Sequence, residues 1–458
     1  MFVISKSLKF VDKYLNQGHE RSIKAKKNII GSLLIKGVSI IISLLMVPIV
    51  INYINPTKYG IWLTVSSIVG WFSFFDIGLT QGLRNKFAEA IAHNDSQKAK
   101  IYVSTTYAVL GIVFSSVWLI FIFVNQFLDW TRILNVDATL RSEVTILAII
   151  VFTYFCISFI LRIVSTIITA NQEPAKASLI TVLGHGISLL IVLILTHITQ
   201  GSLVKLGLAL CLSPIVVLVL ANLYFFRKDL NLYRPSFRYV NFKYGKELFN
   251  LGVKFFVIQL AGIIQFQTAN IIIAQYYGPS EVTSYNIVYK YFSVLNMLFT
   301  IFLAPFWSAS TEAFLKKDIA WIRNSMKKYN HLNIILAIVG ILMLIFSQTI
   351  YKLWLGDGTV NISFTLTLWG MLYFNVLVFG GKYVNFLNGI NALKLQFVSS
   401  ILSPIIYIIV ALFMINYLNN GVQSLYIAAI IANFNAILLA PFQYYMIIIK
   451  KKRGIWLK

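Results

Sequence analysis

Long apolar stretches, each about as long as a bilayer-spanning helix, follow one another along the whole chain with short polar segments between them. A helix rises about 1.5 Å per residue, so roughly 20 apolar residues cross the hydrocarbon core of a membrane. We therefore expect an all-α polytopic membrane protein with about twelve transmembrane helices. The predicted spans are residues 29–54, 59–79, 101–124, 143–169, 175–197, 203–226, 248–275, 282–306, 332–351, 360–381, 394–416 and 424–449.

The bulk composition agrees with a chain that is surrounded mostly by lipid. Of the 458 residues, 58% are hydrophobic and 12% are charged, and the mean hydropathy is +0.78. A water-soluble domain needs a polar surface, which this composition does not provide. Cys156 and Cys211 both lie inside apolar stretches, which indicates packing residues rather than a disulfide or a thiolate metal site.

The lysines and arginines outside the apolar stretches predict the orientation in the membrane. With a cytosolic N-terminus, 30 of the 39 lysines and arginines fall in cytosolic segments and five in the opposite loops. Lys382 is counted here in a cytosolic loop that follows span 360–381. Both termini are therefore predicted to be cytosolic in an inner membrane, and the net charge of +24 reflects topology rather than nucleic-acid binding.

The spans and the basic segments together predict five regions. Residues 1–28 lack the apolar core of a cleavable signal peptide and are expected to lie as a basic segment on the anionic inner leaflet. Two six-helix lobes, residues 29–226 and 248–449, are expected on either side of a basic cytosolic linker at 227–247. Residues 450–458 form a basic cytosolic tail.

A sparse internal repeat supports the two-lobe organisation. At an offset of 223 residues the matching pairs are Tyr53 and Tyr276, Pro56 and Pro279, Val65 and Val288, Glu89 and Glu312, Ala90 and Ala313, and Asp95 and Asp318. The prolines and the acidic residues lie outside the apolar spans, where chance identity is harder to obtain. Six helices repeated in parallel orientation predict two bundles around an axis along the membrane normal, with a central cavity between them.

Ionisable residues inside the predicted spans are the main candidates for a site. A cation near the bilayer centre costs at least about 2.5 kcal/mol, so such residues should face protein or a water-filled cavity. Because the cations outnumber the single acid, we expect the missing negative charge to come from an anionic substrate. The set consists of Lys36, Asp76, Arg162, Lys254 and Lys290, with Arg84 just outside the second span.

Each of these residues also has a structural explanation. Lys36, Arg162 and Lys254 lie close enough to the predicted interface for their side chains to extend to it. Asp76 could fasten two helices by pairing with Lys36 or with the arginine that follows its span. Lys290 lies near the middle of the eighth span, too deep for its ammonium to reach the interface easily.

Other kinds of site find little support in the sequence. The chain has no G-x-x-x-x-G-K-[ST] motif, its five histidines show no metal-binding spacing, and no carboxylate pair suited to glycosyl transfer stands in an outer loop. We therefore expect no enzyme activity, no cofactor and no metal. The imidazole of His185 could gain and lose a proton, although a packing role is the simpler interpretation. Tyr285 and Tyr289 share one face of the eighth span and could stack on sugar rings.

Three short motifs near the N-terminus carry a resemblance to a known family. They are Y-G-I-W at Tyr59 to Trp62, F-D-I-G-L at Phe75 to Leu79, and G-L-R-N-K at Gly82 to Lys86. Together with the surrounding residues 28–95, they resemble the N-terminal region of Wzx-type O-antigen flippases. These are polysaccharide transporters of the MOP, or MATE-like, exporter superfamily.

The resemblance implies a V-shaped pair of six-helix lobes that alternates access. Its expected substrate is an oligosaccharide linked to undecaprenyl diphosphate, moved from the cytosolic to the periplasmic leaflet. By position, the resemblance assigns Lys36, Asp76 and Arg84 to the surface that meets the diphosphate, and it implies glycosyltransferases and a polymerase as partners. The alternatives are a MATE-type drug antiporter, for which an acidic cavity would be expected, and a membrane-embedded polymerase or glycosyltransferase.

Overall fold

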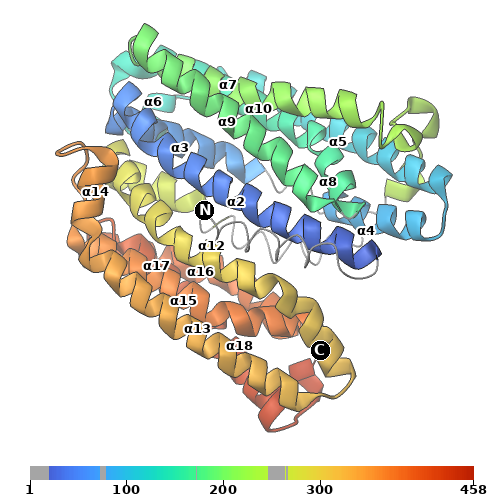
Figure 1. Cartoon of the computed structure of the whole chain (residues 1–458). Coiled ribbons are helices and arrows are strands. Elements are labelled where there is room, and N and C mark those ends of the chain that lie inside the picture. The colour runs from blue at the N-terminus through green and yellow to red at the C-terminus, as the bar shows by residue number, and fades with distance from the viewer. Residues whose placement is uncertain (1–19, 73–78, 172, 246–263, 265–266, 458) are drawn as a thin grey trace, which may run out of the picture.

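The computed structural model describes residues 20–72, 79–171, 173–245, 264 and 267–457. The part of the chain that it describes is helical, without β-strands (Figure 1). The α-helices of the N-terminal half are α2 (Glu20–Ile54), α3 (Pro56–Gly70), α4 (Leu79–Ala92), α5 (Ser96–Asn125), α6 (Trp130–Leu134), α7 (Arg141–Leu161), α8 (Ile163–Ala170), α9 (Pro174–Ile198) and α10 (Leu203–Phe225). Two single 3₁₀ turns, Asn231–Tyr233 and Phe237–Tyr239, follow in the basic linker.

The second half of the chain continues the same pattern. Its helices are α12 (Pro279–Leu315), α13 (Ile319–Ile345), α14 (Ser347–Leu355), α15 (Phe364–Gly389), α16 (Lys394–Asn416), α17 (Ser424–Ala432) and α18 (Ala440–Tyr444). Two π-helical turns, Asn435–Leu439 and Tyr445–Ile449, flank α18.

Nine helices of the described chain are long and apolar enough to cross a membrane. The count becomes ten if α17 and the segment Asn435–Ile449, which are bent by 46° relative to each other, form one broken span. The other two predicted spans, 59–79 and 248–275, run into residues outside the described part. The chain is therefore a multi-pass membrane protein, and the number twelve stays a prediction.

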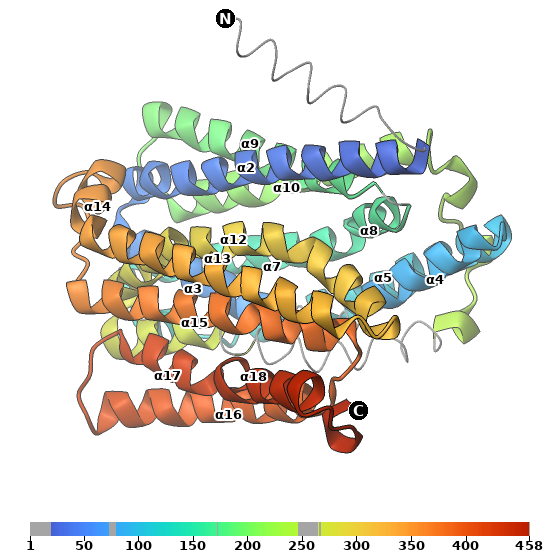
Figure 2. The same ribbon diagram turned by 60° about the horizontal axis from the view of Figure 1, so that its bottom comes forward.

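The helices form two lobes that diverge from each other. Figure 1 shows α2 to α10, in blue to green, in one lobe and α12 to α18, in yellow to red, in the other. The lobes approach each other at the end that holds α6 and α14, and they separate toward the end that holds α4 and α18 (Figure 1). In a second view the C-terminal lobe lies with α13 and α15 side by side at its front (Figure 2).

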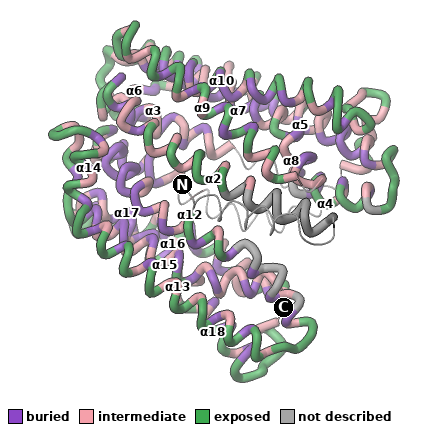
Figure 3. The backbone as a smooth tube through the Cα atoms, viewed as in Figure 1, coloured by how far each residue is buried: buried purple, intermediate pink, exposed green. Residues whose placement is uncertain are grey.

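Each lobe has its own packed interior, and much of the outer surface is apolar. Figure 3 shows the buried positions concentrated inside the lobes and the exposed ones on their outer faces. In the N-terminal lobe, the rings of Phe121 and Phe152 stack with centroids 3.7 Å apart. Exposed residues such as Ile338 and Leu220 are 53% and 59% accessible, as expected for helices that face lipid rather than water.

The predicted repeat is reflected in how the two lobes touch. Pro56 and Pro279 are the first residues of α3 and α12, where the missing proline N–H costs nothing. Gly60 lies so close to α12 that a Cβ atom there would stand 1.7 Å from the carbonyl oxygen of Pro279. In the opposite direction, from α12 to α3, Thr283 Oγ1 donates a hydrogen bond of 2.6 Å to the carbonyl of Pro56. Gly60 and Thr283 are themselves 223 residues apart, so the two contacts are related by the repeat.

The same offset relates two helix starts further along the chain. Asp95 caps α5 by accepting a hydrogen bond of 2.9 Å from the backbone N–H of Lys98. Asp318 caps α13 in the same way, accepting from the N–H of Trp321 at 2.9 Å. Aspartate at the N-cap satisfies an otherwise unpaired helix N–H. The two aspartates of the repeat are therefore explained by local structure rather than by a shared ligand.

One residue assignment from the sequence is wrong. Lys382 was placed in a cytosolic loop, but it lies inside α15, and its side chain is 1% exposed. Its ammonium nitrogen stands 4.6 Å from the ring centroid of Phe379 and 4.9 Å from that of Tyr383. The predicted span ends at Gly381, next to this lysine, whereas the long aliphatic stem of a lysine can be buried when aromatic rings cover its charge.

Candidate functional site

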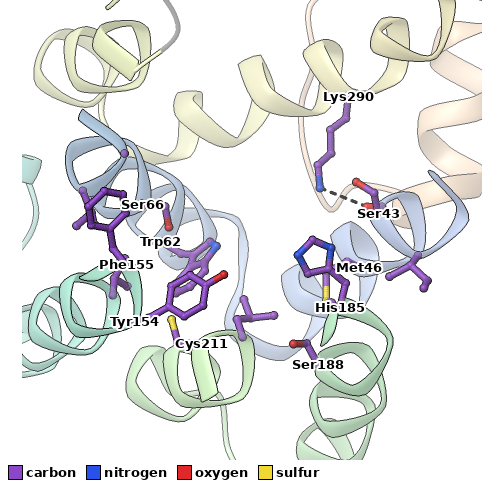
Figure 4. A pocket seen from close by; sticks show the side chains of 15 residues that line it. Ser43, Met46, Trp62, Ser66, Tyr154, Phe155, His185, Ser188, Cys211 and Lys290 are labelled. Carbon is purple, nitrogen blue, oxygen red and sulfur yellow. Dashed lines mark hydrogen bonds between the residues drawn. The ribbon is translucent and has the colours of Figure 1, made fainter. Parts of the chain in front are cut away.

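A cavity of about 320 Å³ lies between the two lobes. Helices α2, α3, α7, α9 and α10 of the N-terminal lobe form most of its wall, and α12 of the C-terminal lobe closes the remaining side (Figure 4). The lining combines aromatic side chains such as Trp62 with hydroxyl groups such as Ser66. It includes no aspartate or glutamate among the described residues.

Lys290 is the cation that α12 contributes to this cavity. Figure 4 shows its side chain reaching from α12 across to α2, where Nζ donates a hydrogen bond of 3.3 Å to the carbonyl of Ser43. Within the described part of the chain, no carboxylate forms an ion pair with Lys290.

Arg162 stands at the edge of the same cavity. It occupies the break between α7 and α8, where it is exposed, and its Nη2 donates a hydrogen bond of 3.4 Å to the hydroxyl of Tyr154. Tyr154 lines the cavity directly (Figure 4). Arg162 therefore contacts the cavity wall through a tyrosine, and its guanidinium has further donors that another acceptor could use.

His185 lies on α9 in the wall of the cavity, and Figure 4 shows its ring projecting into the cavity near the end of the Lys290 side chain. The positive charges of Arg162 and Lys290 both interact electrostatically with this ring. The neighbouring Gly184 packs closely on α10, since a Cβ atom there would lie 3.0 Å from Cα of Pro214. The Gly-His-Gly sequence thus lets α9 approach α10 while the histidine faces the cavity.

Lys36 and Arg84 do not line the cavity in this arrangement. Lys36 is exposed on α2, seven residues before Ser43, and so lies on the same face of α2 roughly 10 Å nearer the diverging end. Arg84 is exposed on α4, also at the diverging end (Figure 1). Asp76 and Lys254 lie outside the described residues.

The two tyrosines proposed for sugar stacking face the interior of the C-terminal lobe. Tyr285 is 4% exposed and stacks on Tyr426, with the ring centroids 4.4 Å apart. Tyr289 packs edge-on against Phe374 at 5.0 Å. Neither ring borders the inter-lobe cavity, where Trp62, Tyr154 and Phe155 are the aromatic lining residues.

Side-chain hydrogen bonds to backbone carbonyls join the lobes at the end where they meet. Trp354 Nε1 donates to the carbonyl of Leu44 at 2.9 Å, which is free to accept because Pro48, four residues later, has no N–H. Asn135 Nδ2 donates to the carbonyl of Gln275 at 3.2 Å. With the Thr283 contact, these bonds close one end of the space between the lobes.

The described residues contain no cluster of His, Cys, Asp or Glu that could hold a metal ion. The arrangement instead offers cations, hydroxyl groups and aromatic rings around a cavity that is closed at one end. Such a site suits an anion with polar and planar portions better than a cation.

One family model matches more than half of the chain. A family model described as "Polysaccharide biosynthesis protein" matches residues 25–308. A protein of Salmonella typhi named "Putative O-antigen transporter" is 22% identical over 368 residues, which cover 77% of this chain and 81% of that protein. A protein of the same name from Salmonella typhimurium is 23% identical over 368 residues, covering 80% and 84%.

Solved structures show the same fold. The inward-facing conformation of a multidrug resistance MATE family transporter of the MOP superfamily superposes with a TM-score of 0.76 at 15% sequence identity. The match covers 90% of this chain and 96% of that one. The prediction of an all-helical, multi-span, MATE-like fold is confirmed.

Proposed function

We propose that this chain, which belongs to the polysaccharide biosynthesis protein family, is a flippase for lipid-linked oligosaccharides. Its substrate would be an O-antigen or related repeat unit carried on undecaprenyl diphosphate. Alternating access would move the repeat unit from the cytosolic to the periplasmic leaflet of the inner membrane, with both termini of the chain in the cytosol. The names of the O-antigen transporters to which the chain is similar support the substrate class.

The observation that carries this proposal is Lys290 in the wall of the inter-lobe cavity, where it has no carboxylate partner among the described residues. A half-buried cation without a carboxylate partner is costly inside a membrane unless water or an anion reaches it. The diphosphate of the carrier lipid supplies such an anion, and a lysine can bind phosphate as a point charge. Arg162 at the cavity edge can add a bidentate contact.

The remaining charges fit a path that leads to this cavity. Lys36 lies on the Ser43 face of α2 toward the diverging end, so it would meet the diphosphate before Lys290 does. We include Arg84, Lys254 and Asp76 in the same path, the last as a partner that balances part of the positive charge. Because all the cations neutralise one group, charge should matter more than side-chain shape.

The size of the cavity limits what it can hold at one time. About 320 Å³ is near the lower end of the range for small-molecule sites. It suits the diphosphate and an adjoining sugar rather than a whole repeat unit. The rest of the glycan would extend between the lobes toward their diverging end, and Trp62 and Tyr154 would stack on the sugar that enters.

A MATE-type drug antiporter is the second candidate, because the fold alone does not distinguish it. Export of a cationic drug calls for an acidic site, and the described lining of the cavity is cationic. A membrane-embedded polymerase or glycosyltransferase would need catalytic carboxylates at the cavity. Such enzymes would instead be partners that act before and after the flipping step.

The test is to delete the gene in the producing cell and to locate the lipid-linked repeat unit. A flippase defect should leave the repeat unit accessible only from the cytosolic leaflet, with surface polysaccharide lost. Unchanged periplasmic exposure of the repeat unit in the deletion strain would contradict the proposal. A change in drug sensitivity with normal polysaccharide would favour the antiporter.

A further inference from the structure

A second cavity, of about 670 Å³, lies in the C-terminal lobe between α13 and α15. Gly381 of α15 faces α12, since a Cβ atom there would lie 2.9 Å from the ring of Phe299. Phe379 and Leu372 line the cavity from the opposite side of α15, and Phe379 is 40% exposed. The cavity therefore opens on the outer face of the lobe, away from α12 and from the inter-lobe cavity.

Lys382 is the charged residue of this cavity, and its side chain is 1% exposed. The rings of Phe379 and Tyr383 cover its ammonium group, with their centroids 4.6 and 4.9 Å from Nζ. In the part of the chain that the structure describes, no aspartate or glutamate forms an ion pair with it. Two rings compensate only part of the lost hydration of a buried cation, so an anion at this site would stabilise the lysine.

Asparagine side chains surround the same space. The Oδ1 atom of Asn333 is buried and has no hydrogen-bond partner among the described residues, while its Nδ2 donates to the carbonyl of Val378 at 3.3 Å. Asn330 and Asn375 complete the polar part of the lining, and Nδ2 of Asn375 donates to the carbonyl of Met371 at 3.0 Å. Each amide nitrogen carries two hydrogens, so an asparagine that donates one of them to a backbone carbonyl can offer the other to a ligand. Buried polar atoms without partners are rare in folded proteins, and Oδ1 of Asn333 can accept a hydrogen bond from a hydroxyl group.

The rest of the lining indicates where an occupant would come from. Ile334 and Ile341 border the cavity and are 60% and 49% exposed on the outer face of α13. Lys382 stands seven residues before the end of α15 at Gly389, roughly 10 Å along the helix axis. The charged group thus lies toward one membrane boundary, with an apolar surface leading from it along the lobe, which matches the shape of a phospholipid.

We propose that this cavity binds the phosphate of an anionic membrane phospholipid, with Lys382 as the counter-charge and the asparagine amides as hydrogen-bond donors. The acyl chains would lie on the exposed isoleucines of α13. The proposal goes beyond the flippase function, since the site opens on a different face of the molecule from the inter-lobe cavity. Its occupant would be a lipid of the bilayer rather than the transported substrate.

The test measures lipid binding by native mass spectrometry on the purified full-length protein in detergent. The probes are phosphatidylglycerol, which is anionic, phosphatidylcholine, which is zwitterionic, and inorganic phosphate alone. The wild type should retain one phosphatidylglycerol more tightly than phosphatidylcholine. Lys382→Met keeps the apolar stem and should weaken phosphatidylglycerol binding about tenfold or more, the factor for one lost charge-assisted hydrogen bond.

Matched variants separate this site from others. Lys382→Arg keeps the charge and should retain the preference for phosphatidylglycerol. Lys394→Met removes an exposed lysine at the start of α16 and should leave phosphatidylglycerol binding unchanged. If Lys382→Met does not yield folded protein, Lys382→Gln replaces it with the same expected loss.

Equal binding of phosphatidylglycerol by the wild type and by the neutral Lys382 variants would overturn the proposal. It would also be overturned if inorganic phosphate alone, at the concentration of the lipid, displaced the bound phosphatidylglycerol. Neither result would bear on export, which is measured separately through the Lys290 variants.

Discussion

Replacement of Lys290 by alanine should abolish or sharply reduce export of the surface polysaccharide. In the structure the ammonium group makes one hydrogen bond, of 3.3 Å, to the carbonyl of Ser43, and has no carboxylate partner among the described residues. Its removal therefore leaves no buried charge unpaired, and the protein level should not fall. What is lost is the positive charge offered to the substrate.

The size of the effect follows from the interaction that is lost. A hydrogen bond to a charged group contributes about 1.5–3 kcal/mol, and each 1.4 kcal/mol corresponds to a factor of ten. Loss of one such contact with the diphosphate should slow flipping roughly 10- to 100-fold. Lys290→Arg keeps the charge and should retain much of the export, whereas Lys290→Met, which keeps only the apolar stem, should behave like alanine.

The assay compares surface polysaccharide with the amount of membrane-inserted protein for each variant. Lys327→Ala removes an exposed lysine on α13 and serves as the matched control, with export expected to stay normal. Normal export by Lys290→Ala, or equal failure of Lys290→Arg and Lys290→Met, would refute the cationic-cavity mechanism. In the second case the shape of the lysine, rather than its charge, would be required.

Three further predictions follow from other parts of the molecule. A reporter enzyme fused after Lys458 should be active only in the cytosol; activity in the periplasm would refute the predicted topology. Gly60→Ala should disturb closure of the lobes, because its Cβ would lie 1.7 Å from the carbonyl oxygen of Pro279. Cysteines introduced at Asn135 and Gln275 report this closure, and they should cross-link less in the Gly60→Ala variant. Gly111→Ala, with open space around it, is the control, and equal cross-linking of both variants would contradict the role of Gly60. Lys36→Ala should reduce export less than Lys290→Ala, and the reverse order would exclude Lys290 as the main contact.

The helical architecture can be predicted from the sequence because each helix that crosses the lipid needs a long apolar stretch. Runs of about 20 apolar residues reveal the spans, and a proline at the first turn marks the starts at Pro56 and Pro279. The 223-residue offset was visible for the same reason, since helix starts and caps require particular residue types. The end of α15 was misplaced because a lysine stem can be buried.

The site was predicted less completely, because periodicity identifies a helix face but not the neighbour that the face meets. Lys290 was found through its charge and depth. Tyr285 and Tyr289 share a face, as expected, but that face packs against Tyr426 and Phe374 inside the lobe. Tyr154 and Ser43 carry no unusual signal, and only the packing of α2, α7 and α12 places them at the cavity.

The contacts that close the lobes are weak enough for a bound substrate to influence them. The bonds from Trp354, Thr283 and Asn135 are all neutral side-chain donors to backbone carbonyls. At about 1 kcal/mol each, they contribute roughly 3 kcal/mol to the closed end. Three further bonds, from Gln275 Nε2 to the carbonyls of Arg132 and Ile133 and from Asn270 Nδ2 to the hydroxyl of Ser67, raise this to about 6 kcal/mol. Reversing a two-state equilibrium from 1:99 to 99:1 takes about 5.5 kcal/mol of differential binding. Two charge-assisted contacts to a diphosphate, from Lys290 and Arg162, supply about 3–6 kcal/mol if they form in only one state. The cations that we propose to bind the substrate would therefore be of the right strength to decide which end of the cavity is open.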